Sequence, residues 1–161
     1  MRIGKAIKNQ RGVICLLGAI CLWLLLIFFL STQNGPETAN TSEGMASVIA
    51  KIIYGTPDAI QVDYVHSEIR RLAHVVLFFI LGSMIGLVCV KVRTRIPVWF
   101  RFLAGYGFLL FCSFFDEWHK QFISGRHNQF KDALLNVRGC TIGLGIIVVI
   151  YLLKKLRDAI M

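Results

Sequence analysis

The sequence predicts an all-α, polytopic membrane protein: a bundle of four transmembrane helices with a short amphipathic helix in the first extracytoplasmic loop. Three observations predict this fold. Apolar residues make up 56% of the 161 residues, and the mean hydropathy is +0.65. Charged residues make up only 17%, against about 25% in soluble domains. They lie in short blocks between four apolar runs, each about the length of a bilayer crossing.

This composition excludes several classes of protein. A disordered chain, a disulfide scaffold and a water-soluble enzyme are all incompatible with it. The net charge of +9 would suggest a nucleic-acid partner in a soluble chain, but here the basic residues flank apolar spans, so we expect no nucleic acid. The five cysteines lie in or beside apolar runs and are interpreted as small hydrophobic residues.

We predict one membrane domain over residues 1–161, with spans at about 13–30, 72–90, 98–115 and 133–153. Basic residues precede the first run, as in a signal peptide. That run ends without a small-residue cleavage site, so we expect a retained helix. In the second and fourth spans, pairs of glycines four residues apart predict close helix packing; these pairs are Gly82 with Gly86 and Gly139 with Gly143.

The positions of lysine and arginine predict the orientation. With both termini in the cytoplasm, 11 of the 18 Lys and Arg residues lie inside and seven outside. The positive-inside rule therefore favours cytoplasmic N- and C-termini in the cell membrane. The extracytoplasmic segments would then be about 31–71 and 116–132.

The first extracytoplasmic segment contains the predicted amphipathic helix, at about 42–55. Ser42 is a candidate N-cap and Gly55 a candidate C-terminal cap. Apolar residues recur between them at helical spacing, namely Met45, Val48, Ile49, Ile52 and Ile53. This face can lie on the outer leaflet or close over the bundle as a lid. Thr56-Pro57 then predicts a second short helix or turn that leads into the second span.

Polar residues gather at the predicted outer ends of three spans. Ionisable residues at such depths are costly and usually face a bundle interior or a polar cavity. We therefore expect one pocket, whose candidate ligand-binding residues are Arg71, His74, Asp116, Glu117, Gln121, Arg126, Asp132 and Asn136. The alternative is that these groups only pair at helix ends and fix the depth of each helix, with Trp118 as an interfacial anchor.

The same residues resemble the VanZ-like family, which is named for an accessory protein of teicoplanin resistance in Gram-positive bacteria. The resemblance covers about 25–155. It rests on Ser31-Thr32-Gln33, Arg70-Arg71-Leu72-Ala73-His74, Asp116-Glu117 with Gln121-Phe122, Gly125-Arg126, and Asp132 followed by Asn136 and Gly139. It implies a cell-envelope membrane protein that contributes to glycopeptide resistance, without implying a particular reaction.

Three functions are compatible with these residues. The first is binding of an anionic amphiphile, either a lipid-linked envelope component or a lipoglycopeptide antibiotic, with Arg71 and Arg126 as the anion contacts. The second is a membrane-embedded hydrolase or transferase that acts on an envelope lipid, with Glu117, Asp132 and His74 as candidate catalytic residues. The sequence offers no convincing nucleophile for it.

The third function is metal binding by His66, His74, His119 and His127. No two of these histidines have a short ligand spacing, so we predict neither a metal nor a cofactor.

Overall fold

The computed structural model describes the backbone of residues 2–32, 35–122 and 130–161, and the side chains of residues 10–32, 44–122 and 130–161. These residues form five helices and no strands. The helices are α1 (Arg2–Thr32), α2 (Gly35–Tyr54), α3 (Ala59–Lys91), α4 (Val98–Lys120) and α5 (Phe130–Ile160). Four of them, all except α2, are long and apolar enough to cross a membrane. The predicted all-α fold is therefore confirmed.

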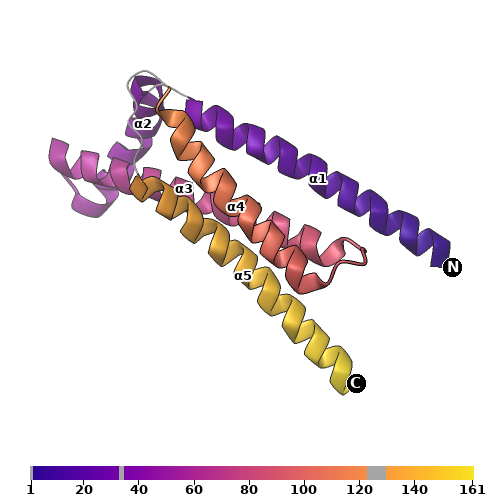
Figure 1. Cartoon of the computed structure of the whole chain (residues 1–161). Coiled ribbons are helices and arrows are strands. Elements are labelled where there is room, and N and C mark those ends of the chain that lie inside the picture. Colours follow the sequence, from indigo (N-terminus) through magenta and orange to yellow (C-terminus); the bar gives the residue numbers. More distant parts are fainter. Residues whose placement is uncertain (1, 33–34, 123–129) are drawn as a thin grey trace.

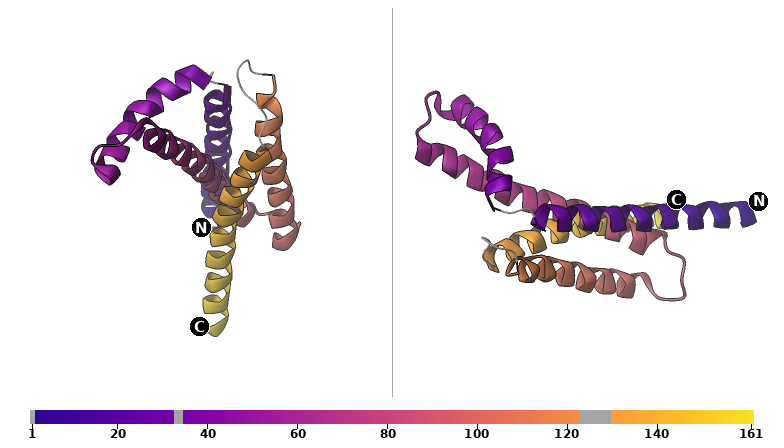
Figure 2. Two further views of the ribbon diagram at one scale, coloured as in Figure 1. Left: turned by 90° about the vertical axis from the view of Figure 1, so that its left-hand side faces the viewer. Right: turned by 90° about the horizontal axis from the view of Figure 1, so that it is seen from above.

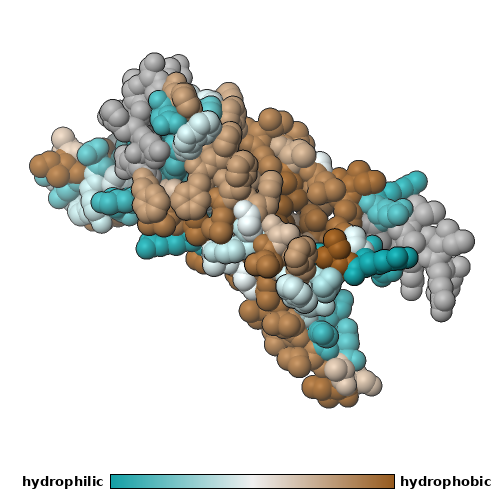
Figure 3. Space-filling view, in the orientation of Figure 1, coloured by the Kyte–Doolittle hydropathy of each residue, from teal (hydrophilic) through white to brown (hydrophobic). Residues whose placement is uncertain are grey.

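The four long helices form an open bundle (Figure 1). The C-terminal ends of α1 and α4 and the N-terminal end of α5 lie together at one end of this bundle, which we call the polar end. Both chain termini point toward the opposite end. Hydrophobic residues cover the middle of the bundle, and hydrophilic residues gather toward its two ends (Figure 3). This banding is the pattern that a bilayer requires of a spanning bundle.

The helices continue beyond the predicted spans. α3 has 33 residues, or about 50 Å at 1.5 Å per residue, whereas a bilayer core is only about 30 Å thick. Of the two predicted alternatives after Thr56-Pro57, the separate short helix is wrong, because residues from Ala59 onward run without a break into the second span. The other alternative, a turn, matches the non-helical residues 55–58. Asp58 starts α3 with a capping box: its side chain accepts a hydrogen bond from the backbone N–H of Gln61 at 2.7 Å, and the Gln61 side chain accepts one from the Asp58 N–H at 3.1 Å.

α2 packs beside the first turns of α3 (Figure 2). The predicted start at Ser42 is wrong, since the helix begins at Gly35; Pro36 is well tolerated in a first helical turn. The predicted end is confirmed, because Gly55 has a φ of 76° and its N–H bonds the Lys51 carbonyl oxygen at 2.9 Å. Such a left-handed residue after a helix favours glycine.

The α3–α5 pair has the most extensive packing in the bundle, and glycines make it possible. A Cβ placed on Gly139 would overlap the backbone of Val75, and one on Gly143 would overlap the backbone of Phe79. Gly82 of α3 lies equally close to the backbone of Cys140 in α5. The predicted small-residue packing is therefore confirmed. These three glycines allow the two backbones to touch, and Gly86 packs closely on the Ile147 side chain of α5.

Candidate functional site

A connected set of polar side chains links α3, α4 and α5 at the polar end. α5 supplies Asn136, which is completely buried. Its side-chain oxygen lies 3.0 Å from Nδ1 of His74 on α3, and its Nδ2 donates a hydrogen bond to Asp116 Oδ2 on α4 at 3.3 Å. Asn136 thus joins one side chain from each of its two neighbouring helices.

The glycine packing explains why Asn136 reaches His74. Gly139 lies three residues after Asn136 on the same face of α5 and contacts the backbone at Val75, the residue after His74. Any side chain at position 139 would push α5 away from α3. The stripe of small residues therefore sets the distance at which the polar side chains above it meet.

α4 contributes an ion-paired cluster to the same site. Asp116, Glu117 and Lys120 are all buried. The Lys120 ammonium lies 3.2 Å from Asp116 Oδ2 and also pairs with Glu117 Oε1. Lys120 lies four residues after Asp116 and three residues after Glu117, the two spacings at which opposite charges meet on a helix surface. We call the set of His74, Asp116, Glu117, Lys120 and Asn136 the polar cluster.

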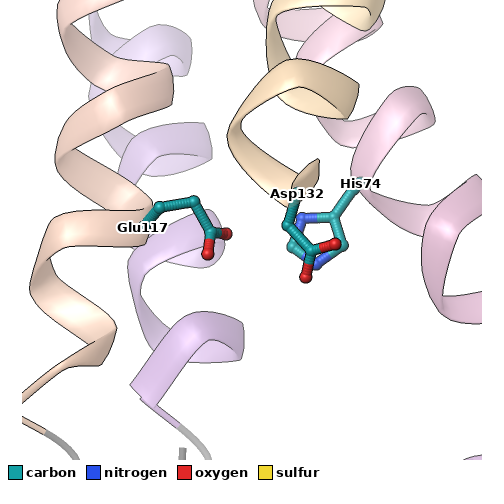
Figure 4. Close-up of side chains that lie close together, drawn as sticks. All are labelled: His74, Glu117 and Asp132. Carbon is teal, nitrogen blue, oxygen red and sulfur yellow. The ribbon is translucent and has the colours of Figure 1, made fainter. Parts of the chain in front are cut away.

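Three residues of the polar end converge on one point (Figure 4). His74, Glu117 and Asp132 each offer one ligand-type atom, and these atoms lie within 4.8 Å of one another. Each residue comes from a different helix. Glu117 is buried and the other two are half-buried, so the point lies at the boundary between bundle and surroundings. Nitrogen and carboxylate oxygen are donors that a divalent transition metal accepts.

A groove of about 380 Å³ lies between α3 and the first turns of α5. Its lining residues are three cations, one carboxylate and two leucines, namely Arg71, Lys131, Arg138, Asp132, Leu134 and Leu135. Arg71 forms an ion pair with Glu68 one turn earlier on α3, and more than half of its side chain remains exposed. We call this feature the cationic groove.

An apolar cavity of about 500 Å³ lies on another side of the polar cluster, between α1, α3 and α4. Its walls are mostly aliphatic and aromatic, with Asp116 as the one charged lining residue among those described; the others are Cys21, Leu24, Leu25, Ile27, Phe28, Phe78, Phe108, Phe111, Cys112 and Phe115. Asp116 therefore has the polar cluster on one side and an apolar space on the other.

The structure brings together most of the sequence-predicted site residues. His74, Asp116, Glu117, Asp132 and Asn136 lie within this one region, as described above. Arg71 lies at its rim, in the cationic groove. Gln121 caps the C-terminal end of α4 and is exposed. Arg126 lies outside the described residues.

Two features of the site were missed at the level of sequence. Lys120 was not among the candidates, although its spacing from Asp116 and Glu117 is the signal that could have identified it. The convergence of His74, Glu117 and Asp132 has no signature at short spacing, because its members come from three helices. His66 and His119 are not part of this convergence; His119 instead packs on the ring of Phe28, with ring centroids 4.5 Å apart. His127 lies outside the described residues.

The fold and the site define a class: a multi-pass membrane protein with a charged cluster at one end of its helix bundle. The VanZ/LLP1 family model matches residues 16–152, so the chain belongs to this family. No curated protein and no solved structure shows significant similarity to the chain.

Proposed function

We propose that this protein binds an anionic amphiphile of the cell envelope and thereby contributes to resistance against lipoglycopeptides of the teicoplanin type. The cationic groove is the observation that carries the proposal. Arg71, Lys131 and Arg138 outnumber Asp132 around it, and guanidinium groups bind phosphate and carboxylate through paired hydrogen bonds. Two leucines in the same groove provide the apolar contact that an amphiphile needs.

The surroundings of the groove favour the same ligand class. The groove lies along the first turns of α5, where the helix macrodipole favours negative charge. The apolar cavity beside Asp116 has a volume within the range of small-molecule pockets, about 300–1,000 Å³, and can receive an acyl chain.

We propose further that the polar end faces the outside of the cell, in the cell membrane. The lysine and arginine distribution supports this orientation. After replacement of the native cysteines, Asn40→Cys and Lys131→Cys should react with an impermeant thiol reagent in intact cells. Thr94→Cys, in the connection at the opposite end of α3, should not. The reverse labelling pattern would overturn the orientation.

Lipid binding tests the amphiphile proposal directly. The full chain in a neutral detergent would be titrated with phosphatidylglycerol and, separately, with phosphatidylcholine, with native mass spectrometry as the measurement. We expect the parent to retain the anionic lipid and the double variant Arg71→Gln/Arg138→Gln to lose at least about tenfold in affinity, since two charge-assisted contacts disappear. The double variant Arg93→Gln/Arg95→Gln, at the opposite end, is the matched control. Equal binding by all three proteins would refute the proposal.

A second candidate function is a membrane-embedded hydrolase or transferase. The convergence of His74, Glu117 and Asp132 favours it, because an imidazole beside carboxylates is a common arrangement for proton transfer. Asp132→Asn separates the two candidates, since the substitution keeps the shape but removes the basic carboxylate. Loss of teicoplanin protection with retained lipid binding indicates chemistry, whereas loss of both indicates a binding pocket.

A further inference from the structure

The hydrogen bonds of the polar cluster determine which nitrogen of His74 carries a proton. The carboxylate of Asp116 can only accept, so the Asn136 group that faces it must be the NH₂. The Asn136 oxygen consequently faces His74, and because this oxygen accepts, Nδ1 of His74 must donate. In neutral His74, Nε2 is then an acceptor.

This protonation state makes the convergence at His74 unusual. Nε2 of His74 and the carboxylate oxygens of Glu117 and Asp132 all carry lone pairs. One ring nitrogen of His74 and one oxygen from each carboxylate lie within 4.8 Å of one another. Three lone-pair donors that point at one place repel one another unless a cation or a proton lies between them.

We propose that His74, Glu117 and Asp132 bind one divalent transition-metal ion of the Zn²⁺ or Mn²⁺ type. One imidazole with two carboxylates matches the borderline ligand preference of these ions. Metal–ligand bonds of about 2.0–2.2 Å place ligand atoms at most about 4.4 Å apart, so small side-chain rotations complete the site. His74 binds through Nε2, while Asn136 and Asp116 hold its ring from behind, as outer-shell partners of metal-binding histidines do.

The ligand count indicates what kind of ion site this is. Three protein ligands leave at least one position open, which is typical of catalytic rather than structural ions. Asp132 belongs both to the metal site and to the lining of the cationic groove. A phosphate held by Arg71 and Arg138 would therefore lie beside the ion. The metal site itself does not depend on the proposed lipid, because ion binding can be measured without any lipid ligand.

Metal binding by the full chain in neutral detergent is the direct test. After removal of metal with a chelator, the parent is titrated with Zn²⁺ by calorimetry and with Mn²⁺ by electron paramagnetic resonance. We expect one ion per chain, and pulsed measurements on bound Mn²⁺ should show coupling to an imidazole nitrogen. His74→Gln and Asp132→Asn should each reduce affinity by more than the ~10–100-fold typical of an outer-shell change, and His74→Gln should remove the nitrogen coupling.

Two further variants make the test specific. His66→Gln changes a histidine on the same helix but outside the convergence, and it should bind like the parent. Asn136→Ala removes the support of His74 and should weaken binding about 10–100-fold. No binding by the parent at millimolar Mn²⁺ or Zn²⁺ would overturn the proposal. So would equal binding by the His74→Gln and Asp132→Asn variants, provided that both elute as single folded species.

Discussion

Two halves of the bundle are packed in different ways. α3 and α5 meet through glycines, so that their backbones touch at Gly82, Gly139 and Gly143. At the contacts of α1 and α4 with α3, at least one partner contributes a side chain; for instance, the Trp23 indole N–H donates to the Leu77 carbonyl oxygen at 3.0 Å. An apolar cavity remains between α1, α3 and α4. The first half is a rigid frame that fixes the polar cluster, and the second leaves space beside it.

This comparison suggests a division of roles. The frame holds His74 and Asn136 at hydrogen-bond distance, which requires positions fixed to a few tenths of an ångström. The second half brings Asp116, Glu117 and Lys120 to the frame from α4. The backbone of α4 meets side chains of α3, for instance at Gly105, where a Cβ would contact Ile85 and Cys89. Because side chains yield more readily than backbone, ligand entry can displace α4 more easily than α5. The predictions below test the two halves separately.

The largest effect is expected from a single methyl group in the frame. Gly143→Ala places a Cβ against the backbone at Phe79 and Ser83, and backbone atoms cannot move aside as a side chain end can. We expect a loss of more than about 3 kcal/mol, beyond the usual range for overpacking, seen as low accumulation and a lowered melting temperature.

Gly145→Ala is the matched control for the frame. It lies two residues further along α5, where a Cβ meets nothing within 4 Å. Alanine is favoured over glycine in helices by roughly 0.5–1 kcal/mol, so this variant should be as stable as the parent or more so. If both alanine variants melt alike, the frame is not rigid and the comparison fails.

A somewhat smaller effect is expected from the ion pairs that connect α4 to the site. Lys120→Met leaves Asp116 and Glu117 buried without their shared ammonium. Removal of one partner from a buried pair costs about 3–5 kcal/mol, which thermal unfolding in detergent should reveal. Lys154→Met, at an exposed position near the other end of α5, should change little. Adding Asp116→Asn and Glu117→Gln to Lys120→Met should restore part of the stability; no restoration would mean that Lys120 acts through packing alone.

The sequence predicted the frame better than the site, and the reason is physical. Glycines spaced four residues apart form a local pattern, and Asn136 lies on the same face of α5 as Gly139. Both features could therefore be predicted from the sequence of a single helix. The buried ion pairs of Lys120 were also local, but a lysine between two apolar spans is first interpreted as a loop charge. The approach of His74 to Glu117 and Asp132 depends on how three helices cross. Such a crossing leaves no periodic signal in any one of them.

The apolar cavity should show a moderate effect of opposite sign. Cys112 is half-buried in the cavity wall, and Cys112→Leu fills part of the empty space. Cavity filling commonly stabilises by about 0.5–2 kcal/mol, and the larger side chain should reduce retention of a bound acyl chain in native mass spectrometry. Cys15→Leu, on the exposed surface of α1, is the control. If Cys112→Leu retains phosphatidylglycerol as well as the parent, the cavity does not hold the tail.

The smallest effect on stability is expected at α2, which belongs to neither half. This helix packs on Val65 of α3 through the buried residues Ala46 and Ala50, while its larger apolar side chains, Val48 and Ile52 among them, are exposed. The alanine face is therefore the one that meets the protein, and the larger face is available to the outer leaflet. Ile52→Ser should change the free energy of unfolding in detergent by no more than about 0.5 kcal/mol.

A nitroxide label on α2 in nanodiscs tests the membrane contact itself. At position 52 it should be reached by oxygen, which concentrates in lipid, more readily than by a water-soluble nickel chelate. At Lys51, an exposed neighbour on the same helix, the order should be reversed, because successive helical residues point about 100° apart. If both positions favour the nickel chelate, this face of α2 lies in water and the expected membrane contact is wrong.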